Sequence, residues 1–188
     1  MGILHKNITK CDLCRAHLPQ PPNPVFQFSE SVKLVIIGQA PGRLAHESNT
    51  PWDDKSGDRL RAWLGIGKSQ FYQAKDIGLV PMGFCFPGTG KSGDLPPRKE
   101  CAPKWHPEIF AVINPKVPKL LVGKYAQDYY LGDKKSIVQR CRDWNSYAPK
   151  YLVFPHPSPR NNIWLKKNLW FETEVIPEYK SIVNAVLT

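Results

Sequence analysis

The chain has 188 residues, 41% of them hydrophobic, which is enough for one domain with a sizeable core. It carries 26 Lys and Arg against 16 Asp and Glu, a formal net charge of +10. Such a charge serves solubility, but it also favours a polyanionic partner, because cationic surfaces release the counterions of phosphates. No stretch could span a bilayer, and the N-terminus lacks the apolar core of a signal peptide. We therefore expect one cytoplasmic domain over residues 1–188, with no membrane partner.

The chain begins with a polar entry segment, residues 1–31, whose four prolines favour an extended path. Four short apolar runs follow, each ending in a turn-forming polar cluster, and such runs predict buried parallel strands. The runs are Lys33–Gln39, Ile77–Gly83, Lys119–Gly123 and Tyr151–His156. Because helical stretches separate them, we expect an α/β fold of three layers, α/β/α, with a four-stranded parallel sheet.

The helical stretches are predicted from apolar periodicity and end signals. After the first strand, Ser56 is the expected N-cap of a helix with an apolar stripe at Leu60, Trp63 and Leu64. The later helices are expected through Glu108–Ile113, over Tyr125–Leu131 with Gly132 closing it, near Ile137–Trp144, and past Pro177 to the C-terminus.

The richest polar clusters follow the first and last strands. They are Gly38–Gly42 (GQAPG) and His156–Asn161 (HPSPRN). Ligands of an open parallel sheet bind beyond the carboxyl ends of its strands. The sequence therefore predicts a polar site between these two strand ends.

Four of the five cysteines form two spaced pairs. Cys11 and Cys14 make C-x2-C, Cys85 and Cys101 make C-x15-C around a loop, and we assign Cys141 to the core. Thiols of a reducing compartment rarely form disulfides, whereas four thiolates suit either zinc or an iron–sulfur cluster. The spacing leaves both open. The alternative is a chance C-x2-C pair with Cys85 as a core residue.

A glycine-rich loop, Gly88–Ser92 (GTGKS), looks like a phosphate-binding loop. That motif needs a glycine where Cys85 stands, and prolines follow the loop instead of a helix start. We therefore do not expect nucleotide hydrolysis. A basic loop near nucleic acid, or a solvated turn, fits better.

Over nearly its whole length the chain resembles the uracil-DNA glycosylase superfamily. GQAPG is similar to the first motif of its iron–sulfur branch, and HPSPRN is similar to the second motif, as found in the single-strand-selective branch. The order and spacing of the four paired cysteines are similar to the ligand set of the iron–sulfur branch. The resemblance implies a [4Fe–4S] cluster, ahead of zinc, on Cys11, Cys14, Cys85 and Cys101, with residues 1–31 as the cluster-binding segment.

The resemblance also implies an activity, a partner and residue roles. A monomer would bind DNA and hydrolyse the N-glycosidic bond of a flipped, deaminated base, uracil first among them, in base-excision repair. The catalytic residues would be His156, donating to the charge on the leaving base, and Gln39, orienting the water. Trp52 would stack on the base, whose pocket would also include Gly38, Ala40 and Asp53. The DNA-binding residues would be Ser158, Pro159, Arg160 and Lys166.

Two positions depart from the family pattern. Ala40 offers no chemistry where many relatives carry an acidic or amide side chain, so another group would have to help the water. The candidates are Glu47, Asp53, Asp54 and His46. Pro81 stands where the iron–sulfur branch has an asparagine that reads the base, and it has no donor. These departures motivate one alternative, a relative that binds lesions or ends without cutting. A third reading is a zinc-stapled α/β enzyme acting on a small nucleoside-like molecule.

Overall fold

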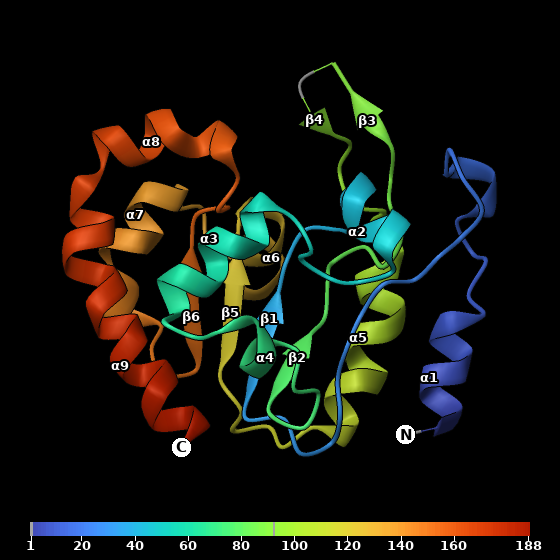
Figure 1. Cartoon of the computed structure of the whole chain (residues 1–188), viewed down its shortest axis with the longest axis horizontal. Coiled ribbons are helices and arrows are strands. Elements are labelled where there is room, and N and C mark those ends of the chain that lie inside the picture. The colour runs from blue at the N-terminus through green and yellow to red at the C-terminus, as the bar shows by residue number, and fades with distance from the viewer. Residues whose placement is uncertain (1, 92) are drawn as a thin grey trace.

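The computed structural model describes residues 2–91 and 93–188. Its middle layer is a four-stranded sheet in the order β2-β1-β5-β6, in which every neighbouring pair is parallel (Figure 1). The strands are β1 (Leu34–Ile37), β2 (Ile77–Leu79), β5 (Lys119–Val122) and β6 (Tyr151–Phe154). The predicted fold class and all four strands are confirmed. Each strand is shorter than its apolar run, because the polar residues at its carboxyl end belong to the loops that follow.

Both faces of the sheet are covered, as continuous apolar strands require. One face packs on α3 (Lys55–Leu64), α7 (Ile137–Arg142) and α9 (Ile176–Leu187). The other face packs on α1 (Gly2–Thr9), α5 (Cys101–Val112) and α6 (Lys124–Leu131). Figure 1 shows the resulting layers, with α9 and α7 on one side of the sheet and α5 and α1 on the other.

Shorter elements complete the described chain. The helices among them are α2 (Arg43–Ser48), α4 (Lys68–Phe71), α8 (Asn162–Lys167), three 3₁₀ turns (Arg15–His17, Trp144–Ser146, Pro159–Asn161) and a π-helical turn (Phe171–Val175). A small hairpin, β3 (Thr89–Gly90) with β4 (Gly93–Asp94), projects from the same end of the molecule as α8 (Figure 1). The hairpin occupies the GTGKS segment, whose Ser92 lies outside the described residues.

Several helix boundaries differ from the prediction. The N-cap of α3 is Asp54, whose carboxylate accepts a hydrogen bond from the Gly57 N–H at 2.8 Å, whereas Ser56 lies buried inside the first turn. Helix α5 begins at Cys101, well before Glu108, and accommodates Pro107 internally. Helix α7 stops at Arg142 and a 3₁₀ turn follows it. The αL cap of α6 at Gly132 and the start of α9 before Pro177 agree with the prediction.

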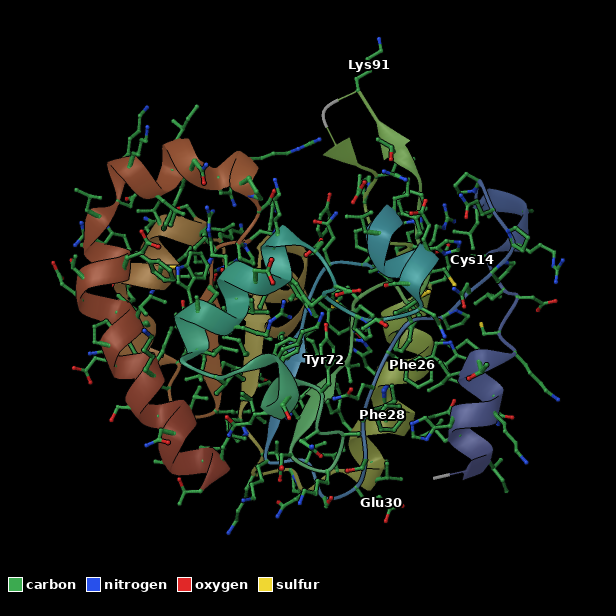
Figure 2. The ribbon with its side chains drawn as sticks, viewed as in Figure 1. Cys14, Phe26, Phe28, Glu30, Tyr72 and Lys91 are labelled. Carbon is green, nitrogen blue, oxygen red and sulfur yellow. The ribbon has the colours of Figure 1, made fainter. Side chains whose placement is uncertain are left out.

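The N-terminal segment is more ordered than a polar, extended path. It opens with α1, whose Ile8 is fully buried, and whose His5 ring stacks on Phe28 with centroids 4.3 Å apart. Phe26 and Phe28, later in the same segment, lie between α1 and the body of the molecule (Figure 2). None of the helices in residues 2–91 and 93–188 has the length and apolarity to cross a membrane.

Candidate active site

A cavity of about 410 Å³ opens at the carboxyl ends of β1 and β6. This volume lies within the range of small-molecule sites, about 300–1,000 Å³. Its lining draws on both predicted polar clusters, the loop before α3 and the β3–β4 hairpin. The lining residues used below are Gly38, Gln39, Ala40, Gly42, Trp52, Asp54, Pro81, Gly93, Asp94, His156, Ser158, Arg160 and Asn161.

Trp52 has a left-handed backbone, with φ at +60°, which is uncommon for a bulky residue. Its indole meets Gly38 with the ring edge at Cζ2, from which a Cβ on Gly38 would stand only 2.5 Å away. The carbonyl of Trp52 accepts from the buried Arg61 guanidinium at 3.3 Å, and the preceding carbonyl of Pro51 accepts from the Tyr72 hydroxyl at 2.8 Å. These contacts hold a strained residue with one indole edge in the cavity, as expected of a functional position.

His156 lies beside Trp52, with ring centroids 5.8 Å apart and planes 30° apart. Its Nδ1 accepts the Ser158 backbone N–H at 3.2 Å, so the proton of the neutral imidazole belongs on Nε2. Burial lowers the pKa of His156 below its ordinary value, and the nearby Asp54 carboxylate offsets only part of that shift. The imidazole is therefore a neutral Nε2–H donor at physiological pH.

The loop after β6 is fixed by hydrogen bonds to its backbone. The Asn161 side chain donates to the His156 carbonyl at 2.7 Å, and Arg59 of α3 donates to the carbonyls of Pro157 and Ser158 at 3.3 Å each. The loop therefore presents His156 on a rigid support.

Arg160 reaches from this loop to the hairpin on the other side of the cavity. A Cβ on Gly93, whose φ is +129°, would stand 1.9 Å from a guanidinium nitrogen of Arg160. Only a residue without a side chain leaves room for this contact. The hairpin and the His156 loop are thus packed together across the mouth of the cavity.

Two carboxylates approach the cavity beside Gly42. A Cβ at Gly42 would lie 3.2 Å from an oxygen of Asp94 and 4.0 Å from the Asp54 oxygen that does not cap α3. Asp53, the predicted base-pocket residue, lies outside the lining, and its carboxylate pairs with Lys68 at 3.1 Å. The structure thus brings Asp54, and not the predicted Asp53, to the cavity wall.

Gln39 and Ala40 both line the cavity. The Gln39 side-chain nitrogen donates to the Leu95 carbonyl at 3.4 Å, which leaves its side-chain oxygen as an acceptor and its second N–H as a donor for a ligand. Pro81 also lines the cavity, and its carbonyl contacts the Nε2 of the buried His106 at 3.0 Å. This position thus offers no side-chain donor to a base.

The remaining predicted residues lie farther out. Ser158 lines the cavity, whereas Pro159 and Lys166 do not, and Lys166 is exposed on α8. Glu47 pairs with Arg43 at the surface, 2.9 Å away. His46 is not among the lining residues either, and its ring lies against Phe86.

Sequence reasoning placed Asn161 in the polar cluster of the site without giving it a role, and it missed Arg59 and Asp94. The last two carry no local signal, because their positions depend on how α3 and the hairpin pack against the loop after β6.

The four paired cysteines gather where the N-terminal segment meets the loop after β2 and the first turn of α5. Burial, and then the nearness of Cys11 and Cys14, raise the pKa of the Cys85 thiol to about 11. Burial raises the pKa of Cys101 to about 12, with Cys14 and Cys85 adding to the shift. Figure 2 shows Cys14 on the N-terminal segment, on the side that faces the body of the molecule. Cys141 is fully buried in the core, as predicted.

The donor chemistry of this cluster fits a thiophilic metal group. The backbone amides of Asn23 and Phe84 hydrogen-bond the sulfurs of Cys85 and Cys101, which favours their thiolate forms. Among residues 2–91 and 93–188, however, no three His, Cys, Asp or Glu side chains are arranged to hold a single metal ion. The four thiols are neighbours without forming a closed mononuclear site.

The family comparison covers the sheet and the cavity. The family model described as the uracil DNA glycosylase superfamily matches residues 25–180, which contain every lining residue named above together with Cys85 and Cys101. Cys11 and Cys14 lie before the matched range. The superfamily is one of DNA glycosylases, and its members act on DNA. This chain belongs to the uracil DNA glycosylase superfamily.

Proposed function

We propose that this protein is a DNA glycosylase that hydrolyses the N-glycosidic bond of a deaminated base, uracil first among the candidates. One observation carries the proposal: the Trp52 indole and the His156 imidazole, far apart in the sequence, lie side by side in one cavity. A base taken out of the stack needs an aromatic face, and the breaking bond needs a donor aimed at the leaving base. The cavity offers both at once.

His156 acts on the leaving base. When the bond between C1′ and the base nitrogen breaks, its electron pair passes to the base, and negative charge spreads to the adjacent carbonyl oxygen. The Nε2–H of His156 is oriented to donate to that oxygen, because Nδ1 is already occupied by the Ser158 N–H. A donor held in place before the reaction contributes typically about 3–4 kcal/mol.

Asp54 and Gln39 act on the water. Water adds to C1′ and must lose a proton. Two carboxylates line the cavity, Asp54 and Asp94, and we assign this role to Asp54 because it is the one near enough to His156 to influence its pKa. One Asp54 oxygen is held by the Gly57 N–H, which fixes the side chain. Gln39 orients the water through its side-chain oxygen. The proton passes through Asp54 to the departed base or to solvent, giving a free base and an abasic site.

The DNA strand runs over the mouth of the cavity in this proposal. Ser158, Pro159 and Arg160 occupy the short turn at the mouth, and Lys166 stands one helix further along. Phosphate contacts of this kind fix the register of a protein on DNA. They support the proposal together with the net charge of +10.

The proposal is tested with the purified full chain and single-stranded oligonucleotides that each carry one uracil, hypoxanthine or xanthine. Abasic sites are revealed by alkaline cleavage of the strand. We expect excision, fastest for uracil. Binding of these oligonucleotides without excision of any base would contradict the proposal and support the alternative, a lesion-binding relative, which the lack of a donor at Pro81 and Ala40 favours.

We also propose that Cys11, Cys14, Cys85 and Cys101 hold a [4Fe–4S] cluster, with zinc as the alternative. Thiolates are ligands of both groups. The nearness of the four thiols, and the backbone amides that hydrogen-bond two of them, support a thiolate-bound group at this place. It would tie the N-terminal segment to the loop after β2 and take no part in bond cleavage. Visible absorption and the iron and zinc contents of protein purified without oxygen test this assignment.

A further inference from the structure

A second hollow, about 690 Å³, lies on the far side of the hairpin root from the active-site cavity. We call it the tyrosine groove. Leu95, Pro96 and Pro97 line one side, and Tyr125 and Tyr129 of α6 line the other, with Lys99 among the lining residues. The two tyrosines are one helical turn apart, so their rings share one face of α6. Both rings are well exposed, Tyr125 at 38% and Tyr129 at 46%.

The groove adjoins the active-site cavity across the root of the hairpin. Asp94 lines the cavity and the next residue, Leu95, lines the groove, so the hairpin root is a wall shared by the two. Gln39, in the cavity, donates to the Leu95 carbonyl and fixes that wall. On the other side, the N-cap of α6 is Gly123, where a Cβ would lie 3.4 Å from that of His156.

Resting on the proposed function, we propose that the tyrosine groove binds the nucleotides of single-stranded DNA that neighbour the flipped base, with their bases stacked on Tyr125 and Tyr129. A strand that enters the cavity must leave it over an adjoining surface, and the groove adjoins it. Exposed aromatic faces with basic residues beside them are the surface on which unpaired bases stack. Lys99 is exposed and suits a phosphate, whereas Arg98 already pairs with Glu100 at 2.7 Å. Paired bases, stacked on each other, could not use these rings.

The test measures affinity, so it does not depend on glycosylase activity. Fluorescence anisotropy is recorded with undamaged oligothymidylates of about four and about twelve nucleotides, and with a duplex of the longer length. For Tyr129→Ala we expect binding of the longer single strand to weaken about 5- to 150-fold, the range that one stacked base supplies. Duplex binding should stay within about twofold. Tyr129→Phe keeps the ring and should bind like the unaltered protein.

Two further variants and one control separate loss of the groove from a folding defect. Tyr125→Ala should weaken the same single strand, and Lys99→Ala should lower the slope of log affinity against log salt by about one unit, while Lys75→Ala, before β2 at the opposite end of the sheet, should not. The proposal is overturned if Tyr129→Ala and Tyr125→Ala both bind the longer strand unchanged, or if Tyr129→Phe loses as much affinity as Tyr129→Ala. A protein that binds through the groove but excises no base would contradict the proposed function alone.

Discussion

The active-site cavity and the cysteine cluster are built in opposite ways. The cavity sits at the carboxyl ends of β1 and β6, entirely within the matched residues 25–180, and rigid contacts fix its side chains. The cluster joins two cysteines inside that range to two outside it, and burial leaves Cys85 and Cys101 with raised pKa values. We propose accordingly that chemistry belongs to the cavity and that the cysteine cluster holds the N-terminal segment in place. Damage to one should therefore spare the function of the other.

The largest expected effect is in the cavity. His156→Ala should slow single-turnover cleavage of a uracil oligonucleotide about 100- to 1,000-fold, because the donor to the leaving base is lost. Binding of the same oligonucleotide should change little, as should the free energy of unfolding. A variant that cleaves at the full rate would refute the role of His156.

Asp54→Asn should also lower the cleavage rate about 100-fold or more, since an amide cannot take the proton of the water. Asn is as good an N-cap as Asp, so α3 should remain intact and the melting temperature nearly constant. The matched control is the adjacent Asp53→Asn, which breaks only a surface pair with Lys68. Equal losses for the two variants would show that neither carboxylate is special.

Substitution in the cysteine cluster should lower stability and leave cleavage intact, the reverse of the cavity variants. Cys14→Ser should abolish any visible absorption of anaerobically purified protein and lower the free energy of unfolding by about 1–3 kcal/mol or more, because a hydroxyl replaces a buried thiol ligand. Cleavage per folded molecule should persist. Cys141→Ser, at a buried cysteine outside the four, should keep the absorption. If Cys14→Ser folds normally yet loses cleavage, the division between the two regions is wrong.

Trp52→Ala should weaken capture of the flipped base by about 1–3 kcal/mol, the value of stacking on one aromatic ring. Trp52→Phe should restore most of it. The readout is the dependence of single-turnover rate on protein concentration. Unchanged kinetics in the alanine variant would remove Trp52 from the site.

His106 connects the two regions, since it lies on α5 behind Cys101 and contacts the Pro81 carbonyl of the cavity. Burial lowers its pKa from 6.5 to about 4, so between these pH values His106 is protonated in the unfolded chain and neutral in the folded chain. The contribution of His106 to the free energy of unfolding is therefore full above about pH 6.5. It falls as the pH is lowered and is smaller by about 2 kcal/mol at about pH 5. Urea unfolding at several pH values should show this slope, and His106→Gln should flatten it. An equal slope in the variant would assign the loss to other groups.

The sheet and the location of the site could be predicted from the sequence because both depend on local pattern. The apolar runs of β1 and β6 and the polar clusters that follow them are contiguous in the chain, and parallel strands bring their carboxyl ends to one edge. This pattern placed His156 at the site, whereas Trp52, which lies beside it, was expected there only from the family resemblance. The same logic failed for α1, whose burial depends on Phe26 and Phe28, far along the chain.

The details of the site could not be predicted, for physical reasons that are visible in the structure. Which of the adjacent Asp53 and Asp54 lines the cavity depends on the backbone path of this loop, which includes a left-handed Trp52 that no propensity favours. The contact of Arg160 with Gly93 joins segments far apart in sequence and depends on how the hairpin packs. Such choices are tertiary, and a single sequence carries no periodic signal for them.

The most direct test of the account is a crystal structure of the protein with a single-stranded oligonucleotide that carries 2′-fluoro-2′-deoxyuridine. The fluorine withdraws electrons from the sugar and slows bond cleavage, so the uncut complex can be observed. We predict that the uracil lies in the cavity with one face on Trp52 and a carbonyl oxygen about 2.7–3.2 Å from the His156 Nε2. A uracil that remains outside the cavity, or that enters it without contacting either ring, would contradict the account.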